Sequence, residues 1–308
     1  MTTPARQFPD RPDAAGFVRA TLAAALAQVQ SHMDAVDAVD AVDAVDAVDA
    51  VDAGSGEAER IHQLRVALRR LRTLLRECAG LAPGMRAEWD APLALAFARL
   101  GTLRDAGTLA DVVRPLLQDA DAPLCEWTVP DAGQADADAA AAVREPQFLQ
   151  TLAEIHALAQ APAGKRQPGL VSLSAAGTRK YLARRLARLH RQVLRDGRHF
   201  DRLPLAQQHR VRKRLKRLRY LADFAREFAP GMWPGKKGRR FAEVLVPAQD
   251  ALGLHNDMAV AAALFRDEAG TDPRAWFAAG YLQARLATSA RSSRRALRAL
   301  ARVPGFWA

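Results

Sequence analysis

Two segments of the sequence place one histidine ahead of a row of cations at helical spacing. The first reads His62-x-x-Arg65-x-x-x-Arg69-Arg70-x-Arg72, and Arg76 continues it. The second reads His209-x-x-Arg212-x-x-x-Lys216-Arg217-x-Arg219. Guanidinium groups are planar forks of donors that match phosphate oxygens, and an imidazole ring adds a donor when it is protonated. The spacing therefore indicates a surface that binds phosphate-rich anions.

A helical wheel separates the cations of both segments into two arcs. At about 100° per residue, four arginines share an arc of about 80° with His62; we call Arg65, Arg69, Arg72 and Arg76 the first basic row. The second basic row, beside His209, is Arg212, Lys216 and Arg219. Arg70 and Arg217 fall on a different arc. Each row borders an apolar stripe. The stripe beside the first row is Ile61, Leu64, Leu68, Leu71 and Leu75, and the stripe beside the second row is Val211, Leu215 and Leu218.

The basic rows contain no acidic residue, either from Arg60 to Arg76 or from His209 to Leu221. Cations at i,i+3 and i,i+4 repel one another, and an ordinary solvated helix face carries both signs. A groove that binds a polyanion explains this pattern better than a solvated or internally paired basic face, which remains the alternative.

Other residues are weaker candidates for phosphate contact or for support of the rows. Lys180, Arg184, Arg188, Arg191 and Arg195 form a third basic row. This row lies on the side of its helix opposite the apolar stripe, as an ordinary solvent-exposed face does. The weaker candidates are Arg70, Lys213, Arg217, Arg104, Lys180, Arg184, Arg188, Arg191, Arg295 and Arg298. Asp105, Asn256 and Asp257 are expected to orient the arginines or to cap helices.

The elements that carry these residues are all predicted to be helical, because no segment sustains a strand alternation. The expected helices are 13–32, 57–80, 85–101, 103–119, 143–160, 174–198, 205–228, 236–253, 256–268 and 273–302. A second landmark, Leu100-Gly101-Thr-Leu-Arg104-Asp105, returns as Leu252-Gly253-Leu-His-Asn256-Asp257. Two landmarks in the same order indicate an internal duplication. We expect two four-helix bundles, 13–160 and 174–303, joined by a linker at 161–173.

Composition narrows the class of protein. The 308 residues carry a net charge of +11, and 39 of the 45 basic residues are arginine, a bias that a GC-rich genome would also produce. A low-complexity Asp-Ala-Val insert at 34–53 contributes seven aspartates and is expected to be a frayed helix or a solvated loop, broken by Gly54-Ser55-Gly56. Two cysteines, no apolar membrane span and no signal peptide predict a cytoplasmic protein.

On both motifs together, the chain resembles the CHAD family, the conserved histidine α-helical domain, over about residues 13 to 303. The resemblance implies two pseudo-symmetric four-helix bundles facing each other across a basic channel, and binding of inorganic polyphosphate. It also implies an association with polyphosphate granules. The Glu-x-Glu-x-Lys motif of the CYTH domain, to which family members are often fused, is missing, so the sequence is similar to a stand-alone member.

Two other functions compete with polyphosphate binding, and a protein scaffold is the remaining class. An enzyme is disfavoured, because the sequence has no Gly-x4-Gly-Lys-Ser/Thr phosphate loop, no His-Glu-x-x-His motif and no nucleophile elbow. Sequence-independent nucleic-acid binding is the stronger rival, although the basic segments hold no aromatic residue beyond Tyr181 and Tyr220 for base stacking. We expect no cofactor and no metal site.

Overall fold

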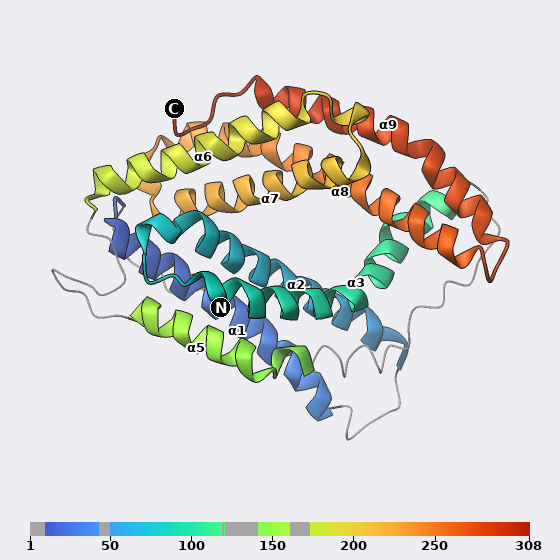
Figure 1. Ribbon diagram of the computed structural model, residues 1–308, viewed down its shortest axis with the longest axis horizontal. Helices are drawn as coiled ribbons and strands as arrows, with labels where there is room; N and C mark the ends of the chain where they lie inside the picture. Colours follow the sequence, from blue (N-terminus) through green and yellow to red (C-terminus); the bar gives the residue numbers. More distant parts are fainter. Residues whose placement is uncertain (1–9, 43–49, 119, 121–140, 161–172) are drawn as a thin grey trace. The chain divides into compact units, whose positions relative to one another are not determined.

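A computed structural model describes residues 10–42, 50–118, 120, 141–160 and 173–308, without the side chains of 37–42, 50–58, 102–112 and 114. All regular structure in these ranges is helical, which confirms the all-α prediction (Figure 1). The α-helices are α1 (Ala14–Val42), α2 (Ala50–Cys78), α3 (Asp90–Gln118), α5 (Pro146–Gln160), α6 (Ala175–Gly197), α7 (Leu205–Phe228), α8 (Gly235–Glu268) and α9 (Ala275–Ala301).

Three predicted helix breaks are wrong. Helix α3 continues through Gly101, and α8 continues through Gly253, where the sequence suggested two helices each. Helix α2 likewise includes Gly54-Ser55-Gly56. A glycine inside a helix costs only about 1 kcal/mol relative to alanine, which tertiary packing readily offsets.

The Asp-Ala-Val insert is helical at both described ends. Helix α1 extends to Val42, and α2 already begins at Ala50. Residues 43–49 between them, and 161–172 of the predicted linker, lie outside the described residues.

The chain divides into two compact units. The first takes the described residues of Met1–Arg104, Ala132–Leu186 and Tyr220–Gly235, and the second takes those of Asp105–Asp131, Ala187–Arg219 and Lys236–Ala308. Each unit thus combines segments from both sides of the predicted linker. The two halves defined by the sequence duplication stay a prediction.

In the first unit, α1 lies against both α2 and α5 (Figure 1). The apolar stripe of α2 is buried throughout, and Leu64, Leu68 and Leu71 are completely enclosed. Phe17 of α1 and Phe148 of α5 are equally buried. Each such side chain contributes about 1.5–3 kcal/mol to folding, so burial of the stripe fixes the rotation of α2. The rotation in turn decides where the first basic row points.

The first part of α6 is tied to the end of α2 within this unit. Arg185 pairs at 2.7 Å with Glu77, whose side chain is buried. The Tyr181 hydroxyl donates to the Glu77 carbonyl at 2.9 Å and accepts from the Gly80 amide at 3.2 Å. These contacts fix the end of the helix that carries the first basic row.

In the second unit, the C-terminal part of α8 packs against the first turns of α9. Met258, Phe265 and Leu282 belong to this core, and Val113 of α3 joins them. A second group of aromatic rings surrounds Phe241, whose centroid lies 4.9 Å from that of Trp307. The two groups anchor both ends of α8, which carries Asn256, the partner of His209. None of the described helices is at once long and apolar enough to cross a membrane.

Candidate anion-binding site

Three arginines of the first basic row gather around one aromatic ring. The guanidinium carbons of Arg65, Arg69 and Arg72 lie 4.6, 4.9 and 6.0 Å from the centroid of Phe97 on α3. The negative face of an aromatic ring attracts cations at this range. Phe97 therefore partly compensates the mutual repulsion of the three charges and holds them together.

Gly101, in the second landmark, makes room for this arrangement. A Cβ atom at position 101 would overlap the guanidinium group of Arg65. Arg65 is itself 7% exposed, so it has little freedom to move aside. The glycine that we expected to end a helix instead allows α3 to pass closely over the first basic row.

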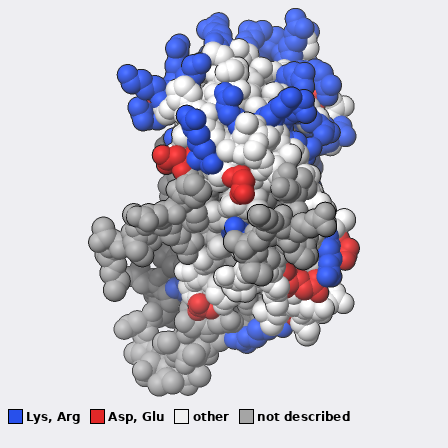
Figure 2. All heavy atoms as spheres, turned by 90° about the vertical axis from the view of Figure 1, so that its left-hand side faces the viewer, with Lys and Arg blue, Asp and Glu red and all other residues white. Residues whose placement is uncertain are grey.

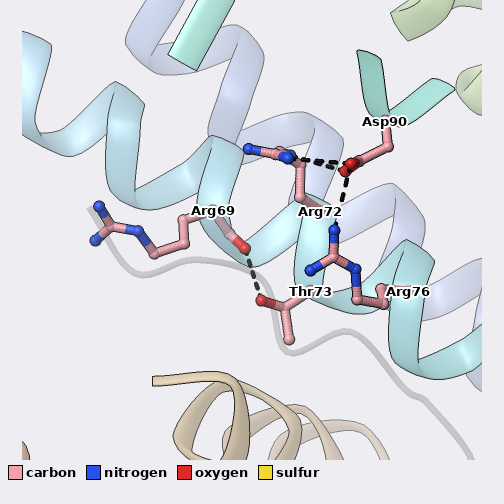
Figure 3. A network of polar contacts seen from close by, with 5 residues as sticks. All are labelled: Arg69, Arg72, Thr73, Arg76 and Asp90. Carbon is pink, nitrogen blue, oxygen red and sulfur yellow. Dashed lines mark hydrogen bonds and ion pairs between the residues drawn. The ribbon is translucent and has the colours of Figure 1, made fainter. Parts of the chain in front are cut away.

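Asp90, at the first turn of α3, accepts hydrogen bonds from two arginines of the row. Arg72 donates to its two carboxylate oxygens at 2.9 and 3.1 Å, and Arg76 donates at 3.3 Å. Figure 3 shows both guanidinium groups directed at Asp90, while Arg69 points away from it. The hydrogen bond from Arg72, more than any other influence, lowers the pKa of Asp90, and the charges of both arginines add to this effect. Arg72 and Arg76 are thus internally paired, as the alternative interpretation of the row allowed.

Arg69 differs from its neighbours in the row. Within the described part of the chain, no carboxylate lies at ion-pair distance from its guanidinium group, which contacts Phe97 instead. The side chain is half-buried. Arg69 is therefore well placed to bind an external anion.

Arg70 contacts another element, as its separate arc on the helical wheel requires. Its guanidinium lies 5.2 Å from the centroid of Phe224 and 3.7 Å from the carboxylate of Glu227, both on α7. Its surroundings indicate a structural role within the first unit.

The second basic row is supported by the residues of the second landmark. Nδ1 of His209 and Oδ1 of Asn256 are 2.6 Å apart, and the Asn256 amide donates to Asp257 at 3.2 Å. Asp257 also pairs with Arg212 at 3.6 Å. Asn256 and Asp257 thus contact the motif residues, and the alternative role of helix cap is wrong for Asp257, because it lies inside α8.

The contact with Asn256 fixes the tautomer of His209. An amide oxygen only accepts, so Nδ1 carries the proton and Nε2 of the neutral ring is an acceptor. Burial lowers the pKa of His209, and the charges of Lys213, Arg212 and Lys216 lower it further against the opposing effect of Asn256. His209 can therefore donate to a phosphate oxygen only after it gains a proton. This condition was not visible in the sequence.

The remaining candidates fall into two groups. His62, Lys216, Arg217 and Arg219 are half-buried on α2 and α7. The others are exposed: Lys213 on α7, Lys180, Arg184, Arg188, Arg191 and Arg195 on α6, and Arg295 and Arg298 on α9. Figure 2 shows Lys and Arg side chains gathered over one part of the surface, with few Asp or Glu among them. The side chains of Arg104 and Asp105 lie outside the described residues.

Sequence reasoning missed the two partners that organise the first basic row. Asp90 follows Arg72 by 18 residues, and Phe97 belongs to the apolar pattern of its own helix, so neither gives a local signal. Among the described residues, no three His, Cys, Asp or Glu side chains gather as ligands for a metal ion.

Comparison with known proteins agrees with this architecture. The family model of the CHAD domain matches residues 39–266. The crystal structure of the CHAD domain from the plant Ricinus communis superposes with a TM-score of 0.69 at 24% sequence identity, covering 97% of this chain and 96% of that one. A comparison with curated proteins gives no match. Because the family model matches well over half of the residues, including both histidine motifs, the chain belongs to the CHAD domain family.

Proposed function

We propose that this protein binds inorganic polyphosphate without transforming it, through the cations of α2 and α7. The observation that carries the proposal is the arrangement of the first basic row, in which Arg65, Arg69 and Arg72 share the ring of Phe97. Polyphosphate carries about one negative charge per phosphate and, unlike a nucleic acid, has no bases that a protein could recognise. Clustered arginines supply interchangeable donors for such a chain.

The second basic row extends the same chemistry to α7. Arg212 is held by Asp257, and Lys213 is exposed one residue further along the helix. A long polyphosphate chain has the multivalency to engage both rows at once, which would raise its affinity far above that of a single phosphate. The basic channel implied by the family resemblance remains part of this proposal.

A titration of the protein with long-chain polyphosphate at several salt concentrations tests the proposal. If phosphate contacts dominate, log affinity falls linearly with log salt; by analogy with nucleic acids, six to ten contacts lose about 10³–10⁵ in affinity between 50 and 200 mM salt. A flat salt response would overturn the proposal.

Two controls separate polyphosphate binding from its rivals. Single-stranded DNA and RNA of matched charge should compete poorly against polyphosphate, and equal competition would indicate a general nucleic-acid binder. Release of orthophosphate during prolonged incubation would show that the protein is an enzyme and contradict the non-catalytic part of the proposal.

A further inference from the structure

A cavity of about 600 Å³ lies within the second unit, between the first turns of α7 and the middle of α8. This volume is within the range of sites that enclose small organic ligands. Its lining includes His209 and Arg212 of the histidine motif, but it also includes a large apolar area that no polyphosphate would need.

The polar side of the cavity comes mainly from one face of α7. His209, Arg212 and Lys213 line it at i, i+3 and i+4 spacing, so their side chains project in the same direction. Asn256 holds His209, and Asp257 holds Arg212, while Lys213 is exposed. Arg212 and Lys213, two neighbouring cations that line the cavity, match a chain of two or three phosphates better than a single carboxylate.

The apolar side is formed by large aliphatic residues that are unusually exposed. Leu205 is 53%, Leu264 39% and Val260 37% exposed, and all three line the cavity. Val260 and Leu264 are one helical turn apart on α8, so they present a continuous apolar surface. A flat apolar group that covered them would remove this surface from water, which is favourable.

The base of the cavity is already ordered and electrically neutral. Nε2 of His255 lies 2.7 Å from Oε1 of Gln208, whose amide donates to the Phe200 carbonyl at 2.9 Å. Both side chains are buried, and burial lowers the pKa of His255. The buried polar groups satisfy one another, so a ligand need not pay to rearrange them.

We propose that this cavity binds an organic phosphate that carries a di- or triphosphate at one end and a flat aromatic ring at the other, the chemistry of a nucleoside polyphosphate. The phosphates lie at Arg212 and Lys213. The flat group lies against Val260 and Leu264. Free polyphosphate would satisfy only the phosphate half of this site, so the inference deepens the proposed function and rests on the same two cations, Arg212 and Lys213.

Adenosine triphosphate and inorganic tripolyphosphate, compared in the absence of divalent cations, test the assignment. They share a triphosphate chain, and only the first has a flat organic group. We expect adenosine triphosphate to bind about tenfold more tightly to the unmodified protein because of the apolar contact. Equal affinity of the two probes would overturn the inference while leaving polyphosphate binding intact.

Variants on α8 locate the apolar contact. Val260→Ser combined with Leu264→Ser should remove the preference for adenosine triphosphate and leave tripolyphosphate binding unchanged. Leu254→Ser is the matched control, because Leu254 is 44% exposed on the same helix and does not line the cavity. All three positions are partly exposed, so the variants should fold. An equal loss in the control and in the double variant would also contradict the site.

Discussion

Replacing Asp90 by asparagine should strengthen polyphosphate binding and weaken the fold. Asp90 competes with phosphate for Arg72 and Arg76, because its carboxylate accepts hydrogen bonds from both. Asparagine keeps the shape of the side chain but removes the charge. The variant therefore releases two cations of the first basic row without altering the row itself.

The magnitude follows from the exposure of the pair. Charge-assisted hydrogen bonds contribute about 1.5–3 kcal/mol, but the Asp90 side chain is 45% exposed, which reduces its contribution to about 1 kcal/mol. We expect the melting temperature to fall by about 2 °C. Removing one carboxylate frees one unit of positive charge, shared by Arg72 and Arg76, so affinity at 0.1 M salt should rise about fivefold, the effect of one further phosphate contact.

The assay is a polyphosphate titration together with a thermal melt of the same sample. Asp250→Asn is the control, because Asp250 is exposed on α8, and among the described residues no cation pairs with it. If Asp90→Asn weakened binding, Asp90 would be an orienting residue and the competition argument would be refuted. If both variants gained affinity equally, polyphosphate affinity would depend only on the net charge of the protein.

Three further predictions concern individual side chains. Arg70→Ala should lower the melting temperature by a few degrees, because Arg70 contacts Phe224 and Glu227, yet change polyphosphate affinity less than Arg69→Ala in the same titration. Polyphosphate affinity should increase as the pH falls from 8 to 6, because His209 must gain a proton to donate and its pKa is lowered in the free protein. The part of this increase that is due to His209 should disappear in His209→Gln. Identical pH profiles of the two proteins would contradict a role of His209 as a donor to phosphate. Cys78 should resist alkylation in the native protein, because burial raises the pKa of its thiol to about 12. The test uses Cys125→Ser, in which Cys78 is the remaining cysteine, and rapid labelling at pH 8 would show that the thiol of Cys78 is accessible to solvent.

The direction of the basic rows was predictable from the sequence, whereas their partners were not. The rotation of α2 follows from its apolar stripe, since Leu64, Leu68 and Leu71 must all face the core. Those positions fix the side of α2 on which Arg65 and Arg69 lie. The pairing of Arg72 with Asp90 depends on how α3 packs against α2, and no local pattern encodes that.

The wrongly predicted break in α3 also comes from a tertiary contact, whereas no tertiary contact accounts for the one at Gly253 in α8. Glycine was interpreted by its local cost to a helix. At Gly101 the decisive term is tertiary, because the absent Cβ leaves space for the Arg65 guanidinium. The duplication was visible because both landmarks recur, but the assignment of each segment to a compact unit depends on long-range contacts.

The central claim is that polyphosphate is bound by charge at particular positions and not by net charge alone. One comparison of two double variants tests it directly. Arg69→Gln with Lys216→Gln removes one cation from each basic row, and Arg239→Gln with Arg240→Gln removes the same charge from an exposed part of α8. At 0.1 M salt, two lost phosphate contacts should weaken binding about 30-fold in the first variant, and the second should lose only about two- to threefold through its long-range charge. Equal losses in the two variants would contradict the account.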